Sequence, residues 1–80
     1  MKYVYLLQSV SCPDKHYVGI TSDFQRRLKA HNSSSSRHTK EHQPWKPVVV
    51  LRFEDDCKAA VFERSMKSGS GHAFAKRHFW

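Results

Sequence analysis

Two short segments near the start of the chain decide the fold: residues 2–8 read KYVYLLQ and residues 16–20 read HYVGI. Both are rich in aromatic, β-branched and aliphatic residues, which favour strands. Alternate residues of a strand lie on the same face, so we expect Tyr3, Tyr5 and Leu7 to share one face of the first strand. The connection between the segments is short and contains a Pro-Asp pair, which predicts an antiparallel pairing of the two strands.

A helix is predicted to follow the second strand. Thr21-Ser22-Asp23 supplies residues typical of a helix start, and Ser22 with Gln25 three positions later matches a capping box. The helix is expected to run to about His31. Residues 32–46 are polar and rich in Ser, so they predict an exposed loop.

The second half of the chain predicts one strand and two helices. Residues 47–53, PVVVLRF, form the most apolar run and favour a central strand that is covered on both faces. A helix over about 57–67 is expected to end at the Gly-containing segment 68–71, because Gly readily adopts the left-handed cap conformation. Residues 72–80 favour a short third helix. The order β-β-α-β-α-α predicts an α+β fold, with a small, three-stranded, largely antiparallel sheet flanked by helices.

Length and charge exclude several classes of protein. Eighty residues suffice for one domain, here 1–80, and exclude a second globular domain or a large substrate-binding architecture. Fourteen Lys and Arg against seven Asp and Glu leave a net charge of +7 at pH 7. That balance favours a polyanionic partner, nucleic acid ahead of a membrane surface, although a soluble basic domain without such a partner would share it.

Cysteine content and hydropathy favour a cytoplasmic protein. Cys12 and Cys57 are too few for a disulfide framework and too far apart for a CxxC site, so we expect reduced thiols. A metal site that includes Cys12 and His16 is a weaker alternative. No apolar run approaches the roughly 20 residues that a membrane span requires.

Glu63 is the first residue whose position suggests chemistry. Its spacing from Ala59, Ala60 and Met66 places it within the apolar stripe of the second predicted helix. A carboxylate buried there requires a cation, either a metal ion or an Arg. An ordinary surface ion pair with Lys67, four residues later, explains the same position equally well.

Arg27 and His31 lie four residues apart on the first predicted helix, so both project from one side. A planar guanidinium beside an imidazole suits a phosphate group. Arg26 and Lys29 belong to the same helix, however, and a solvated basic helix would show the same pattern.

The tyrosines form a third set of candidates. Tyr3 and Tyr5 share a strand face, and Tyr17 lies on the neighbouring strand close to Gly19, which permits a close approach of a ligand backbone or marks a bulge. A phenol has a pKa near 10. Catalysis would therefore need a pKa lowered by a cation such as Arg27, whereas half-buried strand packing needs nothing further.

Taken together, these residues resemble the signature of the GIY-YIG nucleases. The matching elements follow one another in the family's order: Tyr3-Val4-Tyr5, Tyr17-Val18-Gly19, Arg26-Arg27-Leu28, His31 and Glu63. Residues 67–79 resemble the tail of the small stand-alone bacterial members. Many members carry an Asn in the C-terminal part that supports the site, but the one Asn of this chain is Asn32.

The resemblance implies a divalent-metal-dependent endonuclease that hydrolyses phosphodiester bonds in DNA, with Mg²⁺ or Mn²⁺ as cofactor. By position, Tyr5 would help to deprotonate the attacking water, and Tyr17 would orient that water or share the deprotonation. Arg27 would bind the scissile phosphate, and His31 would relay a proton or contact the phosphate. Glu63 would hold the metal ion, and Gly19 would be the structural glycine of the motif.

The remaining basic residues predict contacts with duplex, branched or damaged DNA. The candidates are Arg26, Lys29, Arg37, Lys40 and Lys46. Trp45 either stacks on a base or packs beneath the loop. Two other functions stay open: a non-catalytic nucleic-acid-binding module of the same fold, which the missing C-terminal Asn favours, and a protein-interaction module whose partner completes the site. The sequence predicts no oligomeric state.

Overall fold

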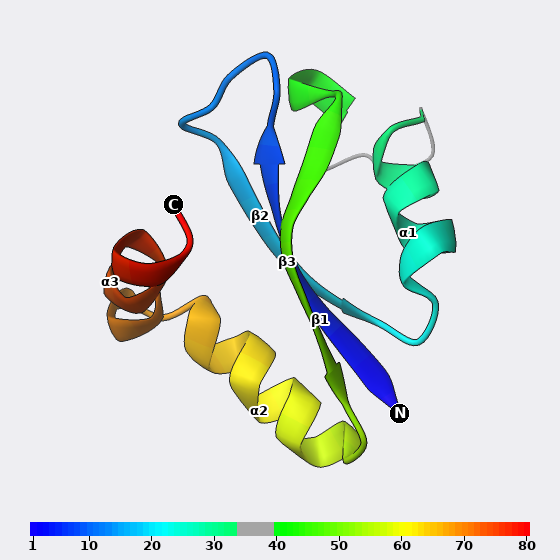
Figure 1. The fold of residues 1–80 in the computed structure, drawn as a ribbon, viewed down its shortest axis with the longest axis vertical. Coiled ribbons are helices and arrows are strands. Elements are labelled where there is room, and N and C mark those ends of the chain that lie inside the picture. The colour runs from blue at the N-terminus through cyan, green and yellow to red at the C-terminus, as the bar shows by residue number, and fades with distance from the viewer. Residues whose placement is uncertain (34–39) are drawn as a thin grey trace.

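The computed structural model describes residues 1–33 and 40–80 and arranges them in three layers (Figure 1). Helix α1 covers one face of a three-stranded sheet, and α2 and α3 cover the other. The elements in chain order are β1 (Lys2–Ser9), β2 (His16–Thr21), α1 (Phe24–His31), the 3₁₀ helix η1 (Lys40–His42), β3 (Trp45–Phe53), α2 (Asp56–Met66) and α3 (Gly69–His78). The predicted α+β fold and the order β-β-α-β-α-α are confirmed.

The sheet has the order β2-β1-β3, and both pairings are antiparallel. The prediction of a central strand at residues 47–53 is therefore wrong: β3 begins at Trp45 and is an edge strand. The prediction that both faces of this strand are covered is also wrong, since Val48 and Val50 are 36% and 37% exposed. Three consecutive valines favour a strand, but they do not determine which strands lie beside it.

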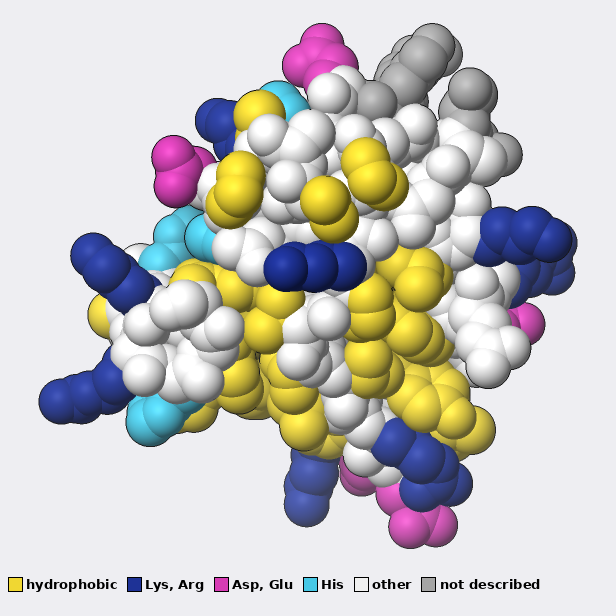
Figure 2. Space-filling view, turned by 45° about the horizontal axis from the view of Figure 1, so that its top comes forward, with side chains coloured by type: hydrophobic (Ala, Val, Ile, Leu, Met, Phe, Trp, Pro, Cys, Tyr) yellow, Lys and Arg dark blue, Asp and Glu magenta, His cyan; other side chains and the backbone are white. Residues whose placement is uncertain are grey.

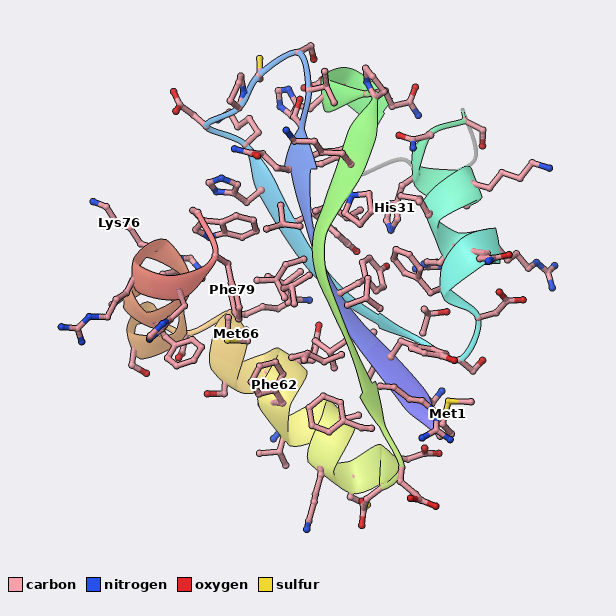
Figure 3. All side chains as sticks on the ribbon, viewed as in Figure 1. Met1, His31, Phe62, Met66, Lys76 and Phe79 are labelled. Carbon is pink, nitrogen blue, oxygen red and sulfur yellow. The ribbon has the colours of Figure 1, made fainter. Side chains whose placement is uncertain are left out.

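Side-chain alternation along β1 divides the core into two clusters, as predicted. Tyr5 and Leu7 face α1, where they pack with Trp45. Leu6 points the other way and packs with Met66 of α2. Trp45 is only 5% exposed, so it packs in the core and does not offer a ring for base stacking. Phe62, Met66 and Phe79 all point from the helical layer toward the sheet (Figure 3).

The start of α1 lies where it is predicted, but its cap is a different residue. Asp23 is the N-cap, and its carboxylate accepts a hydrogen bond of 3.1 Å from the backbone N–H of Arg26. The predicted capping box on Ser22 and Gln25 is wrong. An Asp carboxylate satisfies the free N–H groups and interacts favourably with the positive end of the helix dipole, so it competes well with Ser for this position.

The Gly-containing segment after α2 begins α3 and does not cap α2. Ser68 is the N-cap of α3, and its hydroxyl accepts a hydrogen bond of 3.2 Å from the N–H of Gly71. None of the glycines has a positive φ, so the predicted left-handed cap is wrong. Gly71 is needed because the backbones of α2 and α3 approach each other closely at this position. An added Cβ would overlap the carbonyl oxygen of Ser65 and lie 2.7 Å from the carbonyl carbon of Met66.

The substitution Gly71→Ala is expected to destabilise the protein by about 1–3 kcal/mol, because the backbones of α2 and α3 must move apart to admit the methyl group. Gly69→Ala is the matched control, since a Cβ at Gly69 meets nothing within 4 Å. Urea denaturation of both variants measures the difference. Equal stability of the two variants would show that the α2–α3 contact does not depend on Gly71.

Among the described residues, the helices are too short or too polar to cross a membrane.

Candidate active site

A buried pair of titratable side chains lies between the sheet and α1. The hydroxyl of Tyr5, a fully buried residue, lies 2.8 Å from Nε2 of His31, which is 1% exposed. His31 points from the end of α1 toward the strands (Figure 3). The ring of Tyr17, on β2, has its centroid 4.7 Å from that of His31 and 6.2 Å from that of Tyr5. The structure thus brings together three of the five predicted catalytic residues.

Gly19 explains how the Tyr5 ring fits against the neighbouring strand. The two residues lie opposite each other in the β1–β2 pairing, whose register is continuous. A Cβ on Gly19 would overlap the Tyr5 hydroxyl and lie 2.9 Å from a ring carbon of Tyr17. The predicted bulge is therefore wrong, and the close neighbour is the Tyr5 side chain and not a ligand. Gly19 keeps a structural role, because any larger residue would displace the phenol.

Arg27 joins the cluster from the exposed side of α1. Its guanidinium lies close to the phenols of Tyr5 and Tyr17, and their influence, that of Tyr5 first, raises the pKa of Arg27 above its ordinary value. The helix brings Arg27 and His31 to the same side, as their four-residue spacing predicts. Because Arg27 itself is exposed, its charge is available to an anion from solution.

Burial keeps both members of the Tyr5–His31 pair neutral near pH 7. It raises the pKa of Tyr5, and the neighbouring Arg27 opposes that rise without overcoming it. Arg27 therefore acts in the direction that catalysis by a phenol would need, but burial outweighs it. Burial also lowers the pKa of His31, and the charge of Arg27 lowers it further. Since a neutral phenol has a proton to donate, we infer that Tyr5 donates to Nε2 of His31.

The lowered pKa of His31 predicts that stability falls in acid. Unfolded chains bind a proton to His near pH 6.5, whereas folded His31 resists protonation. Its contribution is therefore complete above about pH 6.5 and is lost as the pH falls through the lower folded pKa. His16 contributes in the same direction, because burial lowers its pKa as well.

The measurement is the free energy of unfolding at several pH values between about 7 and 5. We expect the pH dependence to be weaker in His31→Gln than in the wild type, while His78→Gln, a change at an exposed histidine of α3, keeps the full dependence. The same slope in His31→Gln as in the wild type would contradict the assignment.

Glu63 approaches from α2, on the opposite side of the sheet. Its Oε2 lies 2.5 Å from Nζ of Lys67, and its side chain is 16% exposed. The apolar stripe is confirmed, because Ala59 and Met66 of the same helix are buried. The two alternatives left by the sequence thus occur together, a largely buried carboxylate and an ion pair. The Glu63 charge also raises the pKa of Tyr5, as the smallest of its causes, so the carboxylate acts on Tyr5 electrostatically.

A metal ion at Glu63 is consistent with the donor present there. Within the described ranges, 1–33 and 40–80, His, Cys, Asp and Glu do not form a group of three that could hold a metal. A single carboxylate nevertheless suits Mg²⁺, which keeps most of its waters and often shares its remaining positions with substrate phosphates. Cys12 and Cys57 are exposed free thiols, and the weaker alternative of a site at Cys12 and His16 finds no support in this part of the chain.

The predicted DNA-contacting residues are spread over several elements. Arg26 and Lys29 are exposed on α1, and Lys46 is exposed on β3. Arg37 and the side chain of Lys40 lie outside the described residues. Figure 2 shows Lys and Arg side chains mostly at the edges of one face, with another near its centre among hydrophobic side chains. The positive charge on this face is therefore spread out and does not form one compact patch.

Asn32 has a positioning role that the sequence did not reveal. Its side-chain amide donates to the carbonyl oxygen of Trp45 at 3.0 Å, and its carbonyl oxygen accepts from the N–H of Trp45 at 2.5 Å. Gln43 adds a hydrogen bond of 2.8 Å to the carbonyl oxygen of His31. These bonds fix the end of α1, and hence His31, against the start of β3. An Asn just after a predicted helix is a known capping signal, but its partner on a distant strand is not visible in sequence.

Comparisons with known proteins agree with this arrangement. The family model of the GIY-YIG catalytic domain matches residues 1–77. The "Structure-specific endonuclease subunit SLX1" of Candida dubliniensis is 35% identical, over 94% of this chain and 27% of its own length. The proteins of the same name from Debaryomyces hansenii and Scheffersomyces stipitis are 34% and 37% identical, over 94% of this chain and 22% and 23% of their own lengths.

This chain spans about a quarter of the length of the curated relatives it matches. The matched region nevertheless includes the three strands, α1, α2, all but the last residue of α3, and all of the residues gathered at the site. The chain belongs to the GIY-YIG catalytic domain family.

Proposed function

We propose that this chain is a divalent-metal-dependent endonuclease that hydrolyses phosphodiester bonds in DNA. The observation that carries the proposal is the position of Arg27, which is exposed to solvent and lies beside the phenols of Tyr5 and Tyr17. A guanidinium held in this way presents a planar set of donors to a phosphate. Its charge would also stabilise the additional negative charge that develops on the phosphate in the transition state.

The burial of the two phenols suggests a division of work between them. The resemblance gives Tyr5 the role of the base, but Tyr5 is fully buried, while Tyr17 is only half-buried. We therefore assign the contact with the attacking water to Tyr17. Tyr5, hydrogen-bonded to His31, acts as a positioning residue that holds Arg27 in place. His31, which is neutral and faces both rings, accepts the hydrogen bond of Tyr5 and so fixes the position of that phenol.

Glu63 would hold the metal ion. When bound there, Mg²⁺ or Mn²⁺ would supply electrostatic stabilisation to the phosphate oxygens. The ammonium of Lys67 now occupies one side of this carboxylate, so we propose that metal binding displaces the Lys67 side chain. Lys67 is 53% exposed and can move into solvent at little cost.

Branched DNA is the substrate that we propose, ahead of regular or damaged duplex. The relatives are named structure-specific endonuclease subunits, which supports both this substrate and a protein partner for this chain. The net charge of +7 would draw any DNA toward the site, and Arg26, Lys29 and Lys46 would contact its backbone. The likeness of residues 67–79 to the small stand-alone bacterial members stays a prediction, because the relatives compared with this chain are yeast proteins.

Conversion of supercoiled plasmid to nicked or linear DNA tests the proposal. We expect conversion in the presence of Mg²⁺ or Mn²⁺ and none when a chelator removes the metal. A branched oligonucleotide duplex with the same end label measures the preference for structure. Absence of cleavage of either substrate with both metals, under conditions where the protein binds DNA, would contradict the proposed activity.

A second function is the binding of nucleic acid without cleavage. It is favoured by two polar side chains that already have partners within the protein. Glu63 is paired with Lys67, and Asn32 is hydrogen-bonded to the backbone of Trp45. For this alternative we expect duplex affinity that falls steeply with salt, because phosphate contacts release counterions. A gel-shift titration at several salt concentrations measures it. Affinity insensitive to salt would count against this alternative.

A further inference from the structure

A groove with a volume of about 690 Å³ lies between β2 and α3, on the side of the sheet opposite α1. Tyr17, which belongs to the candidate active site, lines it as well. So does Lys67, the partner of Glu63. The groove therefore shares two lining residues with the proposed catalytic site, although the proposed cleavage reaction makes no use of it.

One wall of the groove is a stacked pair of flat rings. The rings of His16 and Trp80 have their centroids 3.8 Å apart and are inclined by only 9°. Trp80 follows α3, and its backbone N–H donates a hydrogen bond of 2.9 Å to the carbonyl oxygen of Ala75. Its indole also packs against the core cluster around Leu6. His16 remains exposed, so the pair is anchored on one side and accessible on the other.

The remaining lining of the groove combines apolar side chains, Val18, Met66 and Ala75, with charged ones. Lys15 and Lys76 contribute two positive charges, against one carboxylate from Asp14, while Lys67 is paired with Glu63. Lys76 extends from α3 away from the helix axis (Figure 3). Flat rings together with mobile cations suit a nucleotide, because the base can stack on the rings while the phosphates meet the ammonium groups. Neither an acidic peptide nor a simple anion would use the stacked rings.

We propose that this groove binds an unpaired DNA strand, with a base stacked against the His16–Trp80 pair and its phosphates at Lys15 and Lys76. The occupant is single-stranded because a base within a duplex has both of its faces covered by neighbouring bases. The proposal rests on the proposed function and deepens it: an unpaired strand that leaves a branch point at Tyr17 would continue into the groove. The stacked pair thereby becomes a determinant of the preference for branched DNA.

Tryptophan fluorescence gives a readout that does not depend on cleavage. The chain has two tryptophans, and Trp45 is buried in the core on the other side of the sheet. We expect oligodeoxythymidylate of about eight nucleotides to quench the Trp80 emission in a saturable manner. The protein with Trp80→Phe is expected to show no saturable quenching and to keep most of its affinity for a dye-labelled oligonucleotide, since Phe still stacks.

Two further variants test the energetics. His16→Ala and Trp80→Ala are each expected to weaken binding of the labelled oligonucleotide about 5- to 100-fold, the usual loss for one base–aromatic stack. His16 is exposed on an edge strand, so its removal leaves the core intact even if Trp80→Ala destabilises the fold. His78→Ala is the matched control: it removes a histidine from α3 that does not line the groove.

The outcomes for the groove and for the proposed function can be separated. Affinity of His16→Ala equal to that of the wild type, in a protein that cleaves DNA, would overturn the groove proposal alone. A duplex of the same length that competes as well as the single strand would also overturn it. If the protein quenches and binds as expected but cleaves nothing, the proposed function fails and the groove stands as a binding site. Arg27→Ala is expected to keep the quenching.

Discussion

Arg27→Ala is expected to lower the single-turnover rate of DNA cleavage by about a hundredfold to a thousandfold, the usual loss when one preorganised donor to a developing charge is removed. Arg27 is exposed and contributes little to the core, so the fold should persist. The loss should remain at saturating protein concentration, because the guanidinium is proposed to stabilise the transition state more than the bound DNA.

Two neighbouring variants make this measurement specific. Arg27→Lys keeps the positive charge but loses the planar set of donors that contacts Tyr5 and Tyr17, and we expect it to recover only part of the rate. Arg26→Ala removes an equal charge from the adjacent exposed position, and should weaken DNA binding while the saturated rate is largely kept. Equal losses of the saturated rate in Arg26→Ala and Arg27→Ala would show that Arg27 acts only through bulk charge.

Glu63→Gln is expected to reduce metal-dependent cleavage by at least about a hundredfold, because the amide keeps the shape of the side chain but loses the charge that would hold the cation. The ion pair with Lys67 provides an independent check without DNA. Lys67→Met removes the ammonium that now occupies the carboxylate, so Mn²⁺ should bind more tightly to this variant than to the wild type.

The two substitutions should therefore shift Mn²⁺ affinity in opposite directions, as measured by electron paramagnetic resonance of free and bound Mn²⁺. Arg64→Met is the matched control, because it removes an exposed cation of α2 other than the one that pairs with Glu63. It should leave Mn²⁺ affinity closer to that of the wild type than Lys67→Met does. Unchanged Mn²⁺ affinity in both Glu63→Gln and Lys67→Met would mean that Glu63 holds no metal.

The sequence predicts those parts of the fold that local patterns determine. The short connection between residues 2–8 and 16–20 predicts the pairing of β1 with β2, and the alternation along residues 2–8 predicts the face on which Tyr5 lies. The apolar run of β3 indicates a strand but not its edge position. That position depends on which strand pairs with the second edge of β1, and long-range packing determines this pairing.

In the candidate site, too, local patterns predict some features and long-range packing determines the others. The four-residue spacing of Arg27 and His31 predicts that they share one side of α1, as observed. The burial of the Tyr5–His31 pair, which raises one pKa and lowers the other, depends on how closely α1 packs against the sheet. The spacing of residues along the sequence does not determine how close α1 lies to the sheet. The sequence therefore predicts which candidate residues lie on one side of α1, but it does not indicate the direction in which the pKa of Tyr5 shifts.

Cleavage of a labelled branched duplex in water enriched with heavy oxygen tests the central claim, hydrolysis of DNA by this chain, most directly. In hydrolysis the oxygen of the attacking water becomes bonded to phosphorus, so mass spectrometry should find one labelled oxygen in the terminal phosphate of one product strand. We predict this product with Mn²⁺ present, and its loss in Arg27→Ala. Intact DNA after incubation with bound protein and metal, or a product phosphate without label, would contradict the account.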